Sequence, residues 1–193
     1  MTTTAFELLS MSLEDEFCQK IMQETKAKTN KMLRLLCCSK SWNSPLLWGH
    51  YADRHTGIAL ELEAPESHVQ EIQYSKDRVA LDLHSLMRNR HKDENAKWTM
   101  FKMFMTKGIQ WAYEDEARLQ FTLDDLHSLN GHDFFNLNDT IKITGLVLGV
   151  NNKTTDSRII SAVPNNHQVS ITKTQMSALS FEIQEIKKYN LPM

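Results

Sequence analysis

Apolar residues near the start of the chain recur at helical spacing. They follow a capping box of Thr4 with Glu7, and they predict a long amphipathic helix with a solvated, polar continuation through Lys31. The apolar face of this helix consists of Phe6, Leu9, Leu13, Phe17 and Ile21. The same spacing predicts a second helix over 93–107, with its buried side formed by Trp98, Phe101, Phe104 and Met105.

Shorter apolar and alternating runs predict strands. Residues 33–38 form a mainly apolar run suited to a buried strand, and 58–63 alternate, which places Ile58, Leu60 and Leu62 on an expected buried face. Alternation also predicts a strand over 111–122. Further strands are expected at 69–74, 141–149, 169–172 and 181–186, and short helices at 44–53, 81–87 and 156–163.

This order of elements mixes crossover connections with hairpins. It predicts an α+β (mixed α/β) fold in which a single mixed sheet is flanked by helices. The chain has no internal repeat and no Pro/Gly/Ser-rich linker, so we expect one domain over 1–193. Within it, 1–32 forms a helical segment and 33–186 the core.

Composition and charge narrow the class of protein. With 41% hydrophobic and 24% charged residues, the chain has the composition of a globular protein, and no apolar run approaches the roughly 18 residues of a membrane span. The net charge of −2 argues against a nucleic-acid partner. The odd number of cysteines (Cys18, Cys37 and Cys38) indicates free thiols, so we expect a cytoplasmic protein without a membrane partner.

A row of charged side chains is the first candidate for chemistry. On an extended strand Glu114, Glu116 and Arg118 share one face, with neighbours roughly 6.6 Å apart. Close carboxylates push their pKa values apart, which suits a general base or the stabilisation of a cationic transition state. The alternative is a solvated strand face with a cross-strand ion pair, and the residues alone favour that alternative.

The segment around Trp48 is the second candidate. On a short helix Trp48 and Tyr51 form one ridge, and Asp53 is placed to orient the imidazole of His50. These residues fit an orienting hydrogen-bond network better than a ligand pocket walled by the two rings. His55 adds a second imidazole, but its spacing is not that of a metal site, so we predict none.

Two motifs of the chain resemble those of a known protein family. Leu47-Trp48-Gly49-His50-Tyr51-Ala52-Asp53 and Trp111-Ala112-Tyr113-Glu114-Asp115-Glu116-Ala117-Arg118 resemble the bacterial domain-of-unknown-function family 2971 over residues 33–186. Cys38 and Gly49 depart from the family's pattern. The family's N-terminal strand is not matched, so we expect the chain to lack it. The family has no settled activity, so the resemblance implies a site without naming its reaction.

The layout is also similar to that of ADP-ribosyltransferases. The similarity implies that Ser39 and the segment Glu114-Asp115-Glu116 supply two of the three parts of such a site, while the early Arg of those enzymes is missing. It further implies that Glu116 anchors the nicotinamide ribose of NAD as substrate, and that Tyr51 or Trp48 stacks on the nicotinamide.

The leading hypothesis is therefore a pocket for a small molecule or nucleotide in a bacterial cytoplasmic protein. Its catalytic residues are Glu116, Glu114 and His50, and its ligand-binding residues are Ser39, Trp48, Tyr51, Tyr113 and Arg118. The sequence leaves open whether the protein is an enzyme, and it identifies no cofactor beyond NAD as a substrate. The alternative hypothesis is a non-catalytic interaction module in a defence or toxin–antitoxin system, in which these motifs are structural.

Overall fold

Two compact units make up the chain, and we describe each by itself. The first unit comprises residues 1–36 and 120–136, and the second comprises 37–119 and 137–193. The computed structural model describes residues 16–79, 94–137, 140–163 and 169–190. The predicted capping box of Thr4 and Glu7 and the predicted helix at 81–87 lie outside the described residues.

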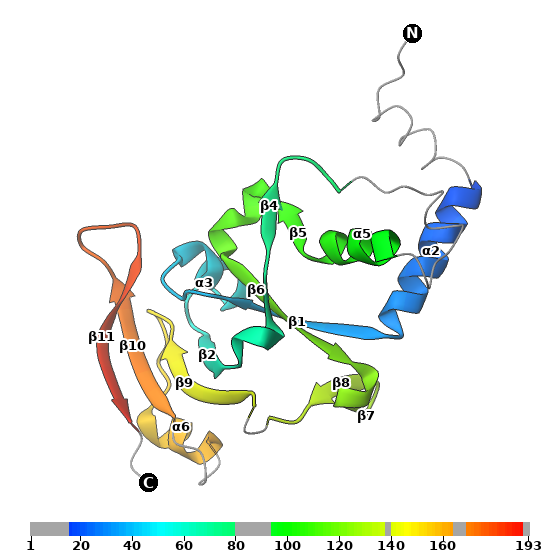
Figure 1. Cartoon of the computed structure of the whole chain (residues 1–193). Helices are drawn as coiled ribbons and strands as arrows, with labels where there is room; N and C mark the ends of the chain where they lie inside the picture. Colours follow the sequence, from blue (N-terminus) through cyan, green and yellow to red (C-terminus); the bar gives the residue numbers. More distant parts are fainter. Residues whose placement is uncertain (1–15, 80–93, 138–139, 164–168, 191–193) are drawn as a thin grey trace. The chain divides into compact units, whose positions relative to one another are not determined.

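The predicted α+β class is confirmed, because the described chain contains both helices and strands, with strands in the majority (Figure 1). The arrangement of the strands differs from the prediction. Where the sequence predicts a single mixed sheet, the described strands lie in four small sheets of four, three, two and two strands.

The first unit contains a helix and a β-hairpin. Its helix confirms the described part of the first predicted helix, and the hairpin closes through an Asn-Gly turn in which both φ angles are positive, as tight two-residue turns require. Its elements are α2 (Glu16–Asn30), the start of β1 (Leu33–Ser39), the end of β6 (Glu116–Thr122), η3 (Leu123–Asp125), β7 (Leu126–Leu129) and β8 (His132–Phe135).

The second unit is built on the four-stranded sheet. The strands follow the order β11-β10-β9-β2, with β9 and β10 parallel and the outer pairs antiparallel (Figure 1). The strands are β2 (Ile58–Glu63), β9 (Lys142–Leu148), β10 (Ser170–Met176) and β11 (Ile183–Asn190), and the helices against them are α3 (Pro45–Tyr51) and α6 (Asp156–Ala162).

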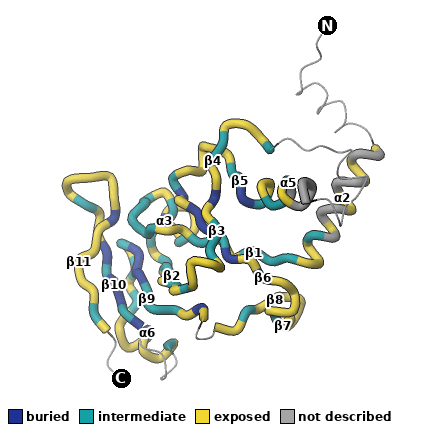
Figure 2. Tube along the Cα trace, viewed as in Figure 1, coloured by how far each residue is buried: buried dark blue, intermediate teal, exposed yellow. Residues whose placement is uncertain are grey.

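Each face of this sheet packs on one of the two helices. Successive residues of a strand point to opposite faces, and β9 ends in the buried pair Val147 and Leu148. Val147 lies in a cluster with Trp48 of α3, whereas Leu148 lies in a cluster with Ile159 of α6. The buried residues therefore gather on β9 and β10, between the helices (Figure 2).

The prediction that Ile58, Leu60 and Leu62 form a buried face of β2 is wrong for the first two residues, while Leu62, after a register shift at Glu61, is half-buried. Ile58 and Leu60 are 50% and 52% exposed, although their alternation with polar residues predicts burial. The reason is position, because β2 is an edge strand and the cluster around α6 is formed on β9 and β10. Ala59, on the opposite face, packs against the Trp48 cluster instead.

Shorter elements complete the second unit. Strand β6 lies between β1 and β3, and β4 pairs with β5 in parallel. The backbone N–H of Gln73 donates to the backbone carbonyl of Met105 at 2.8 Å. This bond links the start of β4 to the residue that follows α5. These elements are η1 (Glu66–His68), β3 (Val69–Glu71), β4 (Gln73–Ser75), α5 (Glu94–Phe104), β5 (Thr106–Gly108) and η2 (Ile109–Glu114).

The predicted strand over 111–122 forms only in its second half. Residues up to Glu114 belong to the 3-10 helix η2, Asp115 takes a left-handed conformation with φ 42°, and the strand begins at Glu116. The Asp115 amide donates to the Ala112 carbonyl and so closes the helical turn. Because of this turn, Glu114 and Glu116 do not belong to one continuous strand face.

Candidate functional site

The two predicted carboxylates nevertheless lie close together, where η2 meets β6. The side chains of Glu114 and Glu116 are only 6% and 5% exposed, and both bind the ammonium group of Lys107 in β5. The Lys107 Nζ lies 3.2 Å from Glu116 Oε2, and it also contacts Glu114 Oε2. The left-handed turn at Asp115 turns the two carboxylates toward the same cation.

Arg118 binds Glu116 from the same face of β6. Its Nε lies 2.7 Å from Glu116 Oε1, and its Nη2 lies 3.2 Å from Glu116 Oε2, so the guanidinium holds both oxygens. The Nη1 of Arg118 also donates to the carbonyl of Phe104. The ion pair therefore links the start of β6 to the last residue of α5.

We call Lys107, Glu114, Glu116 and Arg118 the carboxylate network. Its two carboxylates face two cations, so its formal charge is zero. Burial alone would raise the pKa of Glu116, but hydrogen bonds from Arg118, the Cys37 thiol and Lys107 outweigh it and lower that pKa to about 2. Burial opposes the charge of Lys107 as well, yet its bonds to both glutamates leave its pKa raised.

Two tyrosines are bonded to the network from other elements. The Tyr51 hydroxyl, from α3, donates to Glu114 Oε1 at 2.8 Å, and this hydrogen bond raises the pKa of Tyr51. The backbone amide of Glu116 donates to the Tyr74 hydroxyl of β4 at 2.7 Å. The network thereby joins α3, β4, β5 and β6.

Aromatic rings lie beside the network. Tyr113 stacks on His50 with 6.1 Å between ring centroids, and it lies 6.0 Å from Trp111. The Lys107 ammonium is 4.9 Å from the centroid of Trp111, within the range of a cation–π interaction. His50 therefore contacts the rings of Tyr51 and Tyr113, while the carboxylate of Asp53, its expected partner, bonds to a threonine.

Trp48 and Ser39 use their polar atoms elsewhere. Trp48 is 3% exposed in the core cluster, and its Nε1 donates to the Trp42 carbonyl at 2.6 Å. The Ser39 hydroxyl donates to the Ser41 carbonyl and accepts the Ser41 amide, which makes it the cap of a turn after β1. Of the predicted site, the structure brings together Tyr51, Glu114, Glu116 and Arg118 by hydrogen bonds, with Tyr113 and His50 adjoining through their rings.

The sequence did not single out Lys107, Tyr74 or Cys37 as site residues. Lys107 lies on β5, and no local pattern pairs it with the carboxylates of Glu114 and Glu116. The Cys37 thiol, whose pKa is raised by burial and by its bond to Glu116, comes from β1, far away in the sequence. No local pattern connects Tyr74 or Cys37 to Glu116.

The geometry limits the chemistry of this site. Both oxygens of Glu116 are bonded to cations, so the carboxylate would have to release Arg118 or Lys107 before it could act as a base. Within the described parts of the chain, no group of three His, Cys, Asp or Glu side chains could hold a metal ion.

Among the described helices, none is long and apolar enough to cross a membrane.

Comparisons of the chain with protein-family models, with curated proteins and with solved structures gave no match. The resemblances of the two motifs therefore stay predictions.

Proposed function

We propose that the protein is a non-catalytic interaction module that inserts the tip of its β10–β11 hairpin into an apolar recess of a partner protein. One observation carries the proposal. Leu179 and Phe181, at the tip, are 98% and 97% exposed. Scattered exposed apolar residues are common on protein surfaces, but two large ones that are almost fully exposed on one tip indicate an interaction site.

The hairpin tip is held in a defined conformation. The Ser177 hydroxyl accepts the amides of Leu179 and Ser180 at 3.1 and 3.2 Å, and the Ser177 amide donates to the Glu182 carbonyl at 2.9 Å. The two apolar side chains are thus presented by an ordered turn. A partner that binds them does not have to order this loop, which favours affinity.

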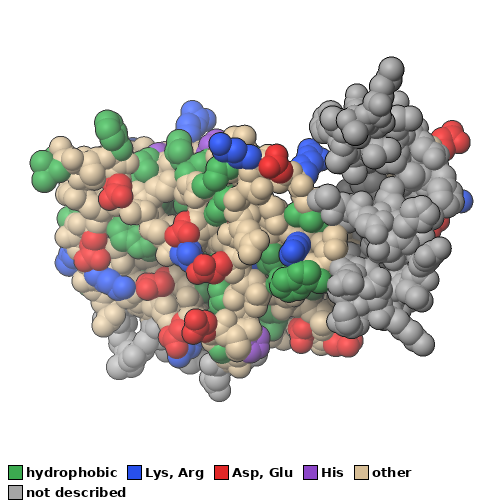
Figure 3. Space-filling model, turned by 45° about the horizontal axis from the view of Figure 1, so that its top comes forward, with side chains coloured by type: hydrophobic (Ala, Val, Ile, Leu, Met, Phe, Trp, Pro, Cys, Tyr) green, Lys and Arg blue, Asp and Glu red, His purple; other side chains and the backbone are tan. Residues whose placement is uncertain are grey.

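The two side chains add nothing to the core of this chain. Burying a large apolar side chain releases about 1.5–3 kcal/mol, so a recess that covers both supplies several kcal/mol of binding free energy. In the space-filling view, hydrophobic side chains project from the margin of the molecule formed by this hairpin (Figure 3). A protein recess of matching shape would recover this energy.

The charge at the tip of the hairpin favours a protein over a lipid surface, since the lysines of the hairpin, Lys173, Lys187 and Lys188, lie outside the tip. Residues 175–186 include Glu182 and Glu185 and no lysine or arginine. An anionic bilayer attracts cationic segments and repels acidic ones, so it is a poor partner for this tip. The partner is expected to offer an apolar recess with a neutral or basic rim.

In this account the carboxylate network serves the fold. It holds the ends of several elements together, and its charges are compensated inside the chain. Transfer of ADP-ribose from NAD, with Glu116 as the catalytic carboxylate, is the competing proposal from the motif resemblance. It requires the buried Glu116 to exchange a bonded cation for a ribose hydroxyl.

The double variant Leu179→Ser/Phe181→Ser should keep the stability of the chain and lose its partner. A photo-crosslinking side chain at position 181 in native cells identifies the partner, and titration of the purified pair measures the affinity. Losing two buried side chains should weaken binding by roughly a hundredfold, while the melting temperature stays nearly unchanged because both side chains are exposed.

Leu129 supplies the matched control. It is 57% exposed at the end of β7, on another hairpin, so Leu129→Ser removes the same kind of side chain from a different surface. Equal affinity of the partner for the chain and for the double variant would contradict the proposal. So would a melting temperature lowered by several degrees, because the side chains would then serve this fold.

A further inference from the structure

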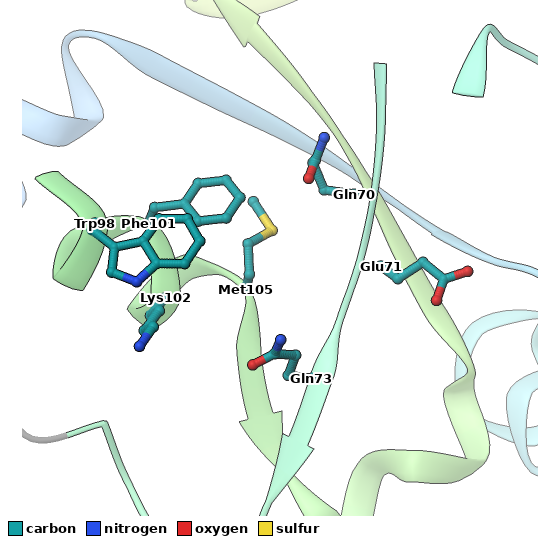
Figure 4. A pocket seen from close by; sticks show the side chains of 7 residues that line it. All are labelled: Gln70, Glu71, Gln73, Trp98, Phe101, Lys102 and Met105. Atoms are coloured by element: carbon teal, nitrogen blue, oxygen red, sulfur yellow. The ribbon is translucent and has the colours of Figure 1, made fainter. Parts of the chain in front are cut away.

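Two neighbouring hollows lie beside α5, away from the hairpin. The first has a volume of about 140 Å³ and is lined on one side by Trp98, Phe101 and Met105, and on the other by Gln70 and Gln73 (Figure 4). The second has a volume of about 260 Å³. They share two lining residues, Gln73 and Lys102, so they adjoin one another.

The first hollow suits an uncharged, planar ring. Trp98 and Phe101 are stacked with 5.5 Å between their ring centroids. The sequence predicts Trp98 on the buried side of its helix, but it is 57% exposed, so part of its aromatic surface is open to a ligand. The amides of Gln70 and Gln73 carry both donors and acceptors, as the edge of a nucleobase does. A cavity of about 150 Å³ holds a molecule the size of benzene, so the hollow accommodates one six-membered ring.

The carboxylate at the rim of this hollow does not change that chemistry. Glu71 points away from the aromatic rings (Figure 4), and its Oε1 lies 3.2 Å from the ammonium of Lys40. An exposed ion pair thus neutralises Glu71. The polar groups that remain beside the rings are the neutral amides of Gln70 and Gln73 and the ammonium of Lys102, which lies 5.5 Å from the centroid of Trp98.

The second hollow suits an anion. It is lined by two cations, Arg78 and Lys102, against one carboxylate, Asp77. The hydroxyls of Ser75 and Thr106 lie on the same hollow and supply further donors. An arginine with a lysine and hydroxyl groups is a set of donors that recognises phosphate.

We infer that the two hollows together bind a nucleoside monophosphate, with the base in the first hollow and the phosphate in the second. Because Gln73 and Lys102 line both, one ligand can occupy the two hollows at once. The site is separate from the residues that the sequence predicted, and it does not rest on the hairpin's function. It places the nucleotide at Trp98 and not at Trp48 or Tyr51.

Calorimetric titration of the full chain tests the inference with four probes: AMP, UMP, adenosine and inorganic phosphate. At least one nucleotide should bind, and both adenosine and phosphate should bind at least about tenfold more weakly, because each fills only one hollow. Trp98→Ala and Arg78→Ala should each weaken the nucleotide by about tenfold. Both side chains are exposed, so circular dichroism should show an unchanged fold.

Trp111→Ala is the matched control, because Trp111 is an exposed tryptophan outside both hollows, and it should leave the nucleotide's affinity unchanged. The inference is overturned if neither nucleotide gives heat at millimolar concentration. It is also overturned if the affinity survives Trp98→Ala, or if phosphate alone binds as tightly as the nucleotide. The double hairpin variant should bind the nucleotide normally, so failure of either proposal is seen independently of the other.

Discussion

Replacing Glu116 by glutamine should lower the free energy of unfolding by roughly 3 kcal/mol. The substitution keeps the shape of the side chain but removes its charge. It leaves Arg118 and Lys107, whose side chains are 15% and 24% exposed, with one carboxylate between them. Removing one partner of a buried ion pair costs about 3–5 kcal/mol. We expect a loss at the lower end of this range because Lys107 keeps its ion pair with Glu114.

Urea denaturation followed by circular dichroism measures this loss. Asp115→Asn is the control, because it makes the same chemical change one residue away, on a carboxylate whose side chain is 53% exposed and pairs with Lys40 at the surface. Asparagine also tolerates the left-handed backbone of that position. The control should unfold like the parent chain, and equal effects of the two substitutions would speak against a buried ion pair.

The stability of the chain should fall steeply in acid, and Glu116 should account for a large part of that fall. Its pKa is about 2 in the folded chain, against an ordinary value of 4.5. A carboxylate whose pKa is lowered by folding contributes stability that is fully present above about pH 4.5 and is lost as the pH falls toward 2. Linkage converts this difference into roughly 3 kcal/mol.

The comparison with Glu116→Gln isolates this contribution. Side-chain hydrogen bonds lower the pKa values of Asp125, Asp133 and Asp156 in the same direction, so the parent chain alone does not identify the group. The difference in unfolding free energy between the parent and the variant should be full at pH 6 and should shrink between about pH 4.5 and 2. Parallel pH profiles would contradict the lowered pKa of Glu116.

The sequence predicted many elements but not how far each extends. The Ser44-Pro45 signal placed α3 correctly, yet the helix ends at Tyr51 and not at Asp53. Asp53 and the two residues after it have positive φ angles, a turn that local propensity does not reveal. Similarly, alternation found β6 through its buried Ala117, Leu119 and Phe121, but extended it across the turn at Asp115.

The sequence predicted the burial of side chains least well at positions where burial depends on which other elements pack against them. The alternation in β2 is regular, but whether Ile58 is buried depends on which strands α6 covers. Trp48 is the opposite case. The sequence predicted it as a ligand-binding residue, but it is buried in the core cluster on the sheet face that packs against α3. Periodicity shows which residues share a face, and only the packing of other elements shows whether that face is covered.

The sequence predicted the charged residues of the candidate site but not the hydrogen bonds that reach them from other elements. The spacing of Glu116 and Arg118 on one strand face is a local property, and their ion pair follows from it. The bonds from Tyr51 and Lys107 arise because α3 and β5 meet the start of β6. Such contacts depend on topology, so the sequence indicated the polar row but not the closed network.

A double-mutant cycle measures whether Glu116 and Arg118 form a structural ion pair. The free energies of unfolding of the parent, Glu116→Gln, Arg118→Met and the double variant are measured at neutral pH. We expect a coupling free energy above about 1 kcal/mol, with the double variant more stable than the sum of the single losses implies. Losses that add within about 0.5 kcal/mol would contradict it.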